Sequence, residues 1–387
     1  MRVLLAFDKY KDSLSARDAC TFARAALLER HRDWTVDVCP LSDGGEGFSE
    51  ILTTAARGQV IGSSVTGPRE DAVQATIGMV PYDRVPVAAR KFLPPPPERP
   101  RATPTVAVID MASASGLALL EPEDRDPWET TTIGTGELIR TATELGAAAI
   151  LLGVGGSATH DLGLGALVAL GLELESARGQ SVYPPIPARW REVNRIAGSV
   201  NPPVPPIRIA CDVSNPLLGP NGAAATYGPQ KGLRPADLPR LDHESARLAL
   251  MLCGHCARPD ALMETPGAGA AGGIAFGLMT AANAELVPGF DLVSAWLDLE
   301  PRLAAADLVI TGEGRFDDSS LQGKGPGAVA ARALALGKRV HVFAGTARAT
   351  QPPANLAVHS ITPEGMPLEQ ALRLASLNLA RAVKAAF

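Results

Sequence analysis

Near the N-terminus, short apolar runs typical of strands alternate with stretches whose apolar residues have helical spacing. The uninterrupted apolar run Val3–Phe7 is typical of a strand buried on both faces. Ser15, with Asp18 three positions on, precedes a stretch of helical periodicity and predicts a capped helix. A second strand at 35–40 and a second helix at 48–56 repeat this order. The succession of strand, helix, strand and helix predicts a parallel sheet covered by helices.

A stretch with a different pattern of residues interrupts this succession of strands and helices. From Gly58 to about Val108 the residues alternate as in strands, and the tract Pro94–Pro97 predicts an exposed polyproline loop. Further strands are expected at 72–80, 107–111, 147–153, 207–213, 308–311 and 339–344, and further helices at 135–145, 163–172, 326–336 and 368–386. Because regular units lie at both ends of the chain, we expect two α/β lobes. Residues 63–287 would then be inserted into a discontinuous domain of residues 1–62 and 288–387.

Composition and charge exclude several classes of protein. The chain has 387 residues, of which 46% are hydrophobic and 20% charged, and its apolar runs fall far short of the roughly 20 residues that span a membrane. A net charge of −5 without a block of Lys or Arg argues against a nucleic-acid partner. The first residues predict a buried strand and not a signal peptide, so we expect a cytoplasmic protein.

The cysteines are expected to be reduced thiols, because their number, five, is odd and no secretory signal is evident. Cys253 and Cys256 have the spacing of a thiol–disulfide exchange motif. Such a motif opens a helix after a strand, whereas this pair ends a helical run. No second ligand pair at zinc spacing follows, so the sequence disfavours both a redox and a zinc role.

Clusters of polar and glycine residues follow several predicted strands. They are Asp8–Ser13, Asp43–Gly47, Gly153–Asp161, Asp212–Pro216 and Thr311–Asp317. An open α/β sheet binds its ligands beyond the carboxyl ends of its strands. Each cluster combines a carboxylate with residues that let the backbone approach a ligand closely. The sequence therefore predicts a ligand site assembled from several loops.

The residue types in these clusters favour a nucleoside triphosphate. Such a polyanion needs amide donors, a cation and usually magnesium held by carboxylates. The glycine-rich turn Gly153–Thr159 could bind phosphate, and Lys324 between two glycines could contact it. Asp43 with Glu46, and Glu313, have glycine neighbours that leave their carboxylates unshielded. A single carboxylate such as Asp8 or Asp161 could equally be a helix cap.

The glycine-rich turn and the Gly323-Lys324 pair also bear on two other nucleotide-binding classes. The turn also fits Gly-x-Gly-x-x-Ala, with Glu173 and Glu175 about 20 residues further on, which is a weak dinucleotide fingerprint. An NAD-dependent oxidoreductase is therefore an alternative. A P-loop kinase is excluded, because Gly323-Lys324 is followed by Gly325 and lacks the first glycine of that pattern.

A series of short motifs, spread over almost the whole chain, carries a family resemblance. They are Asp8, Lys11 and Ser13; Asp43–Gly47; Thr66–Pro68; Ala114–Leu117; Thr131–Leu138; Gly153–Asp161; Cys211–Val213 with Asn215–Gly219; Gly228–Gly232; Pro266–Gly273; and Thr311–Arg315 with Asp317 and Gly323–Lys324. In this order they resemble the bacterial glycerate kinase family, and no rival family places them so.

The resemblance implies a fold and a reaction. The fold is a flavodoxin-like (Rossmann-like) parallel-sheet domain with a second α/β domain inserted, and the active site lies in the cleft between the lobes. The reaction is transfer of the γ-phosphate of ATP to D-glycerate with Mg²⁺. Most such enzymes are thought to form 2-phosphoglycerate, although 3-phosphoglycerate stays open, and a homodimer is the assembly considered.

The same resemblance suggests roles for individual residues. Asp43 or Asp161 would be the catalytic base, since phosphoryl transfer needs one carboxylate to orient the attacking hydroxyl. Lys11 and Lys324 would neutralise phosphate oxygens or bind the glycerate carboxylate. Asp212 and Glu313 would hold Mg²⁺ directly or through water. The remaining substrate- and nucleotide-binding residues are expected to be Asp8, Ser13, Glu46, Gly155, Gly156, Ser157 and Thr159.

Some positions depart from the family pattern. His160 stands where members usually have Asn, and Leu162 stands where they have Gly. Both lie beside the predicted phosphate turn. A nucleotide-binding regulator that has lost catalysis is therefore the third alternative, and His160 is the feature that supports it.

Overall fold

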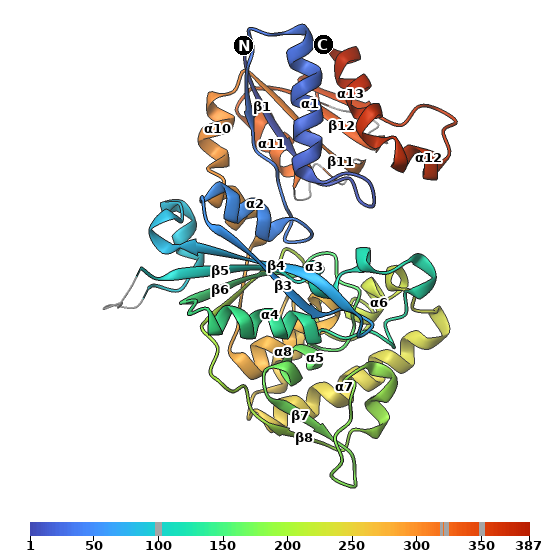
Figure 1. Cartoon of the computed structure of the whole chain (residues 1–387). Helices are drawn as coiled ribbons and strands as arrows, with labels where there is room; N and C mark the ends of the chain where they lie inside the picture. Colours follow the sequence, from blue (N-terminus) through green and yellow to red (C-terminus); the bar gives the residue numbers. More distant parts are fainter. Residues whose placement is uncertain (97–102, 318–319, 321–324, 348–352) are drawn as a thin grey trace. The chain divides into compact units, whose positions relative to one another are not determined.

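The computed structural model describes residues 1–96, 103–317, 320, 325–347 and 353–387, and it divides into two compact units (Figure 1). Unit 1 comprises Met1–Asp43 and Val293–Phe387, and unit 2 comprises Gly44–Leu292. We expected the division after residue 62. It falls after Asp43, because the next helix, α2 (Phe48–Ala55), packs on the sheet of unit 2.

The sheet of unit 1 has five parallel strands in the order β13-β12-β11-β1-β2. Their bounds are β1 Arg2–Phe7, β2 Thr35–Val38, β11 Leu308–Phe316, β12 Arg339–Ala347 and β13 Leu356–Ser360. Numbered within the unit, this is the order 2-1-3-4-5 of a flavodoxin-like sheet. The prediction of a parallel-sheet α/β domain is confirmed. The strand order reverses between β1 and β11, which is where such sheets bind ligands.

Helices cover both faces of this sheet. They are α1 (Ala16–Arg30), α10 (Leu299–Ala305), α11 (Pro326–Ala335), α12 (Leu368–Arg373) and α13 (Ala375–Ala386), and α9 (Gly289–Trp296) spans the return of the chain into unit 1. The cap of α1 is as predicted, since the Ser15 hydroxyl accepts from the Asp18 amide. In Figure 1, α1 and α13 lie side by side over the sheet. Val3, Leu5 and Phe7 share a core cluster with them, and the alternate strand residues are equally buried.

The main sheet of unit 2 has six strands in the order β10-β9-β6-β5-β4-β3. Their bounds are β3 Gln59–Thr66, β4 Ala72–Pro81, β5 Thr105–Asp110, β6 Ala149–Gly153, β9 Ile207–Ala210 and β10 Glu285–Val287. β5, β6, β9 and β10 run parallel, whereas β3 and β4 form an antiparallel pair at the edge. A separate pair, β7 (Leu172–Glu175) and β8 (Arg195–Gly198), is antiparallel.

Unit 2 contains helices of very different lengths. The α-helices are α2, α3 (Ala112–Ser115), α4 (Ile133–Glu144), α5 (Leu164–Ala169), α6 (Ala223–Tyr227), α7 (Leu238–His255) and α8 (Ala270–Ala282). The 3₁₀ helices are η1 (Tyr82–Arg84), η2 (Val87–Phe92), η3 (Leu117–Leu119), η4 (Pro122–Asp124), η5 (Pro187–Glu192), η6 (Pro229–Lys231), η7 (Pro235–Asp237) and η8 (Asp260–Glu264). One apolar cluster joins the sheet to α4, α5, α7 and α8.

Several expected elements differ in extent. The strand expected at 207–213 ends at Ala210, and the helix expected at 368–386 is two helices, α12 and α13. In the proline tract, Pro94 is buried whereas Pro95 and Pro96 are exposed, and Pro97 lies outside the described residues. Across the described ranges, no helix combines the length and apolar character that a bilayer crossing requires.

Candidate active site

Five of the predicted site residues line one cavity of about 470 Å³ in unit 1. They are Asp8, Lys11, Ser13, Asp43 and Glu313. The cavity lies at the carboxyl ends of β1 and β11, where the strand order reverses. Its position is therefore the one that the topology of an open α/β sheet predicts for a ligand.

The loop after β1 is held in place by Tyr10. Its amide donates to the Leu14 carbonyl at 2.8 Å, and its buried hydroxyl donates to the Phe343 carbonyl at 2.7 Å. Asp8, directly after β1, donates its amide to the Gly312 carbonyl of β11 at 3.0 Å. These bonds fix the backbone beside the cavity and leave Lys11 exposed at its rim.

Carboxyl groups in this cavity have raised pKa values. Burial, and then the nearby Asp43 carboxylate, raise the pKa of Asp8 to about 8, although Lys9 opposes the shift. Burial, and then Asp317, raise the pKa of Glu313 to about 7. Lys9 Nζ lies 3.5 Å from Asp43 Oδ1. The cavity therefore holds buried acidic groups whose negative charge the neighbouring lysine offsets only in part, and a bound cation would stabilise their ionised forms.

This arrangement fits one class of metal site. In the described part of the chain, no group of three or more His, Cys, Asp and Glu side chains could hold a metal by itself. Magnesium usually binds one or two carboxylates and completes its shell with water and phosphate oxygens. Asp8 and Glu313 fit that pattern. Asp212, the other predicted ligand, belongs to unit 2, where its Oδ2 accepts from the Phe290 amide at 2.8 Å.

The glycine-rich turn after β6 in unit 2 uses its donors within the protein. The Gly155 amide donates to the Gly44 carbonyl, and the Ala158 amide donates to the Ser115 carbonyl, both at 2.9 Å. Gly156 has φ +73°, and a Cβ there would lie 2.4 Å from Glu46 Oε1. The Gly155 and Ala158 amides of the turn are therefore bonded within the protein, and the role of the turn in phosphate binding stays a prediction.

Lys231, at the end of η6, stabilises this turn from the protein interior. Its ammonium donates to Ser157 Oγ at 2.8 Å and to the Thr159 carbonyl at 2.6 Å. The side chain is buried, and burial lowers its pKa to about 7, against the effect of Asp161. Ser157 and Thr159 are both buried. Sequence reasoning gave Lys231 no role, although its motif Gly228–Gly232 places the lysine next to a glycine.

Asp161 is a fully buried carboxylate with an internal role. Its Oδ2 accepts from the Thr132 amide at 2.7 Å and from the Thr132 hydroxyl at 2.8 Å. The amides of Gly163 and Gly165 donate to it at 3.1 Å. Burial raises the pKa of Asp161, and these hydrogen bonds oppose the shift. The carboxylate joins two buried loops, and we do not assign it the role of base.

His160 lies behind the turn and not on its surface. Its Nε2 is 3.0 Å from Ser245 Oγ, and that hydroxyl donates to the Leu241 carbonyl at 2.7 Å. Because a serine has one proton to donate, Nε2 of His160 is the donor. Burial and then Lys231 lower the pKa of His160 to about 3, so the ring is neutral. The histidine at position 160, where the family usually has asparagine, therefore contributes to the packing of the interior behind the turn.

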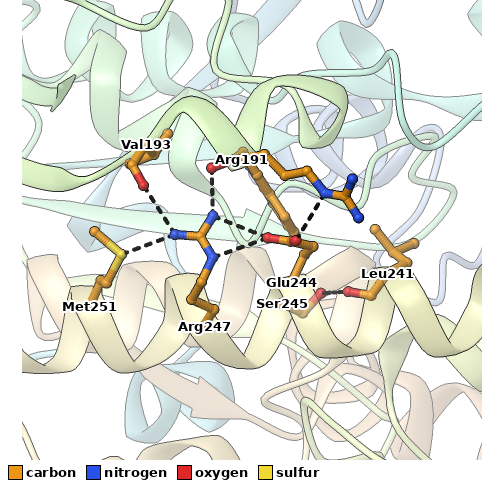
Figure 2. Close-up of polar contacts among 8 residues, drawn as sticks. Arg191, Val193, Leu241, Glu244, Ser245, Arg247 and Met251 are labelled. Carbon is orange, nitrogen blue, oxygen red and sulfur yellow. Dashed lines mark hydrogen bonds and ion pairs between the residues drawn. The ribbon is translucent and has the colours of Figure 1, made fainter. Parts of the chain in front are cut away.

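Helix α7, which carries Ser245, is fastened by an arginine (Figure 2). The Arg247 guanidinium donates to Glu244 Oε2 at 3.1 Å, to the Val193 carbonyl at 3.0 Å and to the sulfur of Met251 at 3.5 Å. Arg191 reaches Glu244 from the other side, at 3.4 Å. This network joins α7 to η5 and to Val193, the residue that follows it.

The geometry disfavours a dinucleotide site. Helix α5 begins at Leu164, after the fingerprint residues, and has only 6 residues. A dinucleotide-binding turn opens directly into its helix. Glu175, one of the two expected ribose carboxylates, pairs with Arg195 at 2.7 Å within the two-stranded sheet. Both observations weaken the oxidoreductase alternative.

The remaining predictions concern Lys324 and the cysteines. Lys324 lies outside the described residues. All five cysteines are free thiols, as expected. Burial raises the pKa of Cys253 and of Cys256, and Cys253 lies within the last turn of α7. A raised thiol pKa opposes disulfide exchange.

Comparisons with known proteins settle the family. The glycerate kinase family model matches residues 3–387. The chain belongs to the glycerate kinase family. It is 36% identical to the glycerate kinase of Bacillus subtilis (strain 168), over 99% of this chain and 96% of the relative. It is 37% identical to glycerate 2-kinase of Escherichia coli (strain K12), over 89% and 85% of the two chains.

The fold agrees with a solved structure. A crystal structure from Salmonella typhimurium LT2, provisionally named glycerate kinase 2, superposes with a TM-score of 0.73 at 37% identity, over 100% of this chain and 97% of the other. The predicted resemblance to glycerate kinases is confirmed. The chain is an enzyme of this family, which decides against the oxidoreductase alternative.

Proposed function

We propose that this glycerate kinase transfers the γ-phosphoryl group of ATP to a hydroxyl of D-glycerate and requires magnesium. The observation that supports this most is the meeting of anion-binding and cation-binding groups in one cavity of unit 1. Lys9, Lys11 and Arg315 line the cavity with Asp8 and Glu313. Lysine and arginine are suited to phosphate oxygens, and carboxylates are suited to a hard cation.

Asp43 is the proposed catalytic base. Its side chain is 47% exposed, so a substrate hydroxyl can reach it. Asp8 and Glu313 are the proposed magnesium ligands in this cavity, and a carboxylate bound to the cation is not available to accept the proton. Asp161 is fully buried. Among the carboxylates considered, Asp43 thus combines access with a position in the cavity.

Phosphoryl transfer exchanges one bond at the γ-phosphorus for another. The glycerate hydroxyl oxygen forms a bond to the γ-phosphorus while its proton passes to the Asp43 carboxylate. The bond from the γ-phosphorus to the bridging oxygen breaks, and its electron pair leaves on ADP. Asp43 then releases the proton to water. Phosphoryl transfer depends mainly on positioning and charge neutralisation, which Lys9, Lys11 and Arg315 would provide around the phosphate oxygens.

Asp8 and Glu313 are the residues that would hold magnesium in unit 1. When bound, the ion would share phosphate oxygens and neutralise charge that develops on the leaving group. Asp212 stays a proposed ligand from unit 2, and Ser13 a proposed substrate contact. Glu46, Gly155 and Gly156 stay proposed contacts as well, with a supporting role for the buried Ser157 and Thr159.

The proposed product is 2-phosphoglycerate. The Escherichia coli relative is named glycerate 2-kinase, which supports transfer to the 2-hydroxyl. The 3-hydroxyl is the competing acceptor. We also propose the cytoplasm as the location, supported by the five free thiols, and a homodimer as the assembly, which light scattering would test.

ADP release with D-glycerate, L-glycerate or no acceptor tests the reaction. We expect strong dependence on ATP and D-glycerate, loss of turnover after chelation, and restoration by added magnesium. Phosphorus NMR of the product separates the two hydroxyls. ADP release that ignores D-glycerate would overturn the proposal, and a 3-phospho product would correct its regiochemistry alone.

A further inference from the structure

One wall of the unit 1 cavity is apolar. Leu368, Ala371, Leu372 and Ala375 line it, and Ile361 joins them from the segment after β13. Leu368, Ala371 and Leu372 have the spacing i, i+3 and i+4, which places them on one face of α12, and Ala375 is the first residue of α13. Such a stripe normally packs into a core. Here it faces a cavity, and Leu368 is 74% exposed.

The loop after β1 and the strand β11 contribute charged residues to the same cavity. They are Asp8, Lys9, Lys11, Glu313 and Arg315. Thr346 and Thr362 lie with the apolar residues and supply polar groups there. A cavity lined by apolar residues from one segment and by charged residues from others, with a few hydroxyls, is typical of a site for an amphipathic ligand.

The volume excludes glycerate as the sole occupant. At about 30 Å³ per heavy atom, the share of a water molecule in the liquid, a three-carbon hydroxy acid fills roughly 200 Å³. The cavity measures about 470 Å³. Glycerate also has no apolar face to place against Leu372 or Ala375. Cavities of this size hold ligands as large as a nucleotide.

We infer that the stripe Leu368–Ala375, with Ile361, is the nucleoside subsite of the enzyme. The base of the nucleotide packs against Leu372, Ala371 and Ile361, and its phosphates extend toward Lys9, Lys11 and Arg315. This rests on the proposed function, and deepens it by assigning the phosphoryl donor to unit 1. The apolar stripe lines the cavity, and the flat face of the adenine ring would supply an apolar surface for it to contact.

Kinetics of Leu372→Asn test this inference. The substitution places an amide on the apolar wall, and we expect the KM for ATP to rise about tenfold, in line with partial loss of a buried leucine contact. The KM for D-glycerate should stay within about twofold. Leu377→Asn is the matched control, because Leu377 is an exposed leucine of α13 that does not line the cavity. Thermal unfolding of each variant checks that it folds.

Calorimetric binding separates the nucleoside from its phosphates. ADP should bind Leu372→Asn about tenfold more weakly than the unmodified enzyme, whereas inorganic tripolyphosphate should bind both equally. A rise in the KM for D-glycerate alone, or an unchanged affinity for ADP, would overturn the inference. ADP binding that weakens in the variant, in an enzyme without D-glycerate-dependent turnover, would overturn the proposed function and retain the nucleoside subsite. Leu368→Asn, at the exposed mouth, provides a second variant if Leu372→Asn fails to fold.

Discussion

The ammonium group of Lys231 lies 2.6 Å from the carbonyl oxygen of Thr159, although 72 positions separate the two residues in the chain. The lysine is buried, and a second hydrogen bond holds the Ser157 hydroxyl. This cation therefore supports the glycine-rich turn from the protein interior. Its buried charge costs free energy whenever the group is protonated.

Lys231 should make the stability of the enzyme depend on pH. Its pKa falls from 10.5 to about 7 on folding. Between these values the unfolded chain binds more protons than the folded one, so the free energy of unfolding rises with pH, by at most about 1.4 kcal/mol per pH unit from this group. Below about pH 7 both states are protonated and the contribution is constant.

Urea unfolding of Lys231→Met at several pH values from 7 to 10 checks this. In Lys231→Met, the part of the free energy of unfolding that rises with pH should be lost. Lys384→Met, a change at a surface lysine that pairs with Glu29, should retain this rise. An identical slope in Lys231→Met and the unmodified enzyme would contradict the assignment.

His160→Asn should leave turnover within about threefold. The ring is buried and neutral, and its contribution is one hydrogen bond from Nε2 to Ser245. A glutamine amide has the reach to donate a bond from the position of Nε2, whereas the shorter asparagine and a leucine do not. His160→Leu should therefore cost only about 1 kcal/mol of stability, because the Ser245 hydroxyl loses the bond that it accepts but keeps its own bond to the Leu241 carbonyl. A large gain of activity in His160→Asn would instead support the regulator alternative.

Asp43→Asn should lower kcat about a hundredfold or more, as loss of a general base typically does. The KM for ATP should change little. Asp12→Asn is a matched control, since Asp12 lines the same cavity and has φ 60°, a conformation that asparagine tolerates. If Asp43→Asn keeps turnover within about tenfold, Asp43 is not the base.

Arg247→Ala should destabilise unit 2 by about 2 kcal/mol or more. The substitution removes bonds to two carbonyls and leaves the buried Glu244 with only Arg191 as its ionic partner. Arg191 is 67% exposed, so Arg191→Ala should cost less than about 1 kcal/mol. Equal losses in the two variants, measured by urea unfolding, would show that Arg247 does not fasten α7.

Sequence reasoning places the residues that follow regular strands more readily than those in irregular segments. Asp8 and Glu313 meet because they lie at the carboxyl ends of neighbouring parallel strands, a relationship that strand order determines. Ser157 and Thr159 occur in an irregular turn, where spacing does not fix the direction of a side chain. Lys231 could not be found from periodicity, since a short 3₁₀ helix brings it to the turn.

The stripe from Leu368 to Ala375 illustrates a related difficulty. Its helical spacing was visible in the sequence, and the helices there were predicted as one. Periodicity identifies which side chains share a face, but not what that face contacts. Only the tertiary structure reveals a cavity instead of a core beside these residues.

The discontinuity of unit 1 has a consequence for synthesis on the ribosome. β1 is a central strand, and its partner β11 begins at Leu308, beyond all of unit 2. At about 5–20 residues per second, translation of the inserted residues Gly44–Leu292 takes on the order of 10 to 50 seconds. During that interval the apolar strand Val3–Phe7 has β2 and α1 but lacks β11. The nascent chain therefore exposes an unpaired edge that chaperones would have to shield, and a folding defect in unit 2 would prolong the exposure.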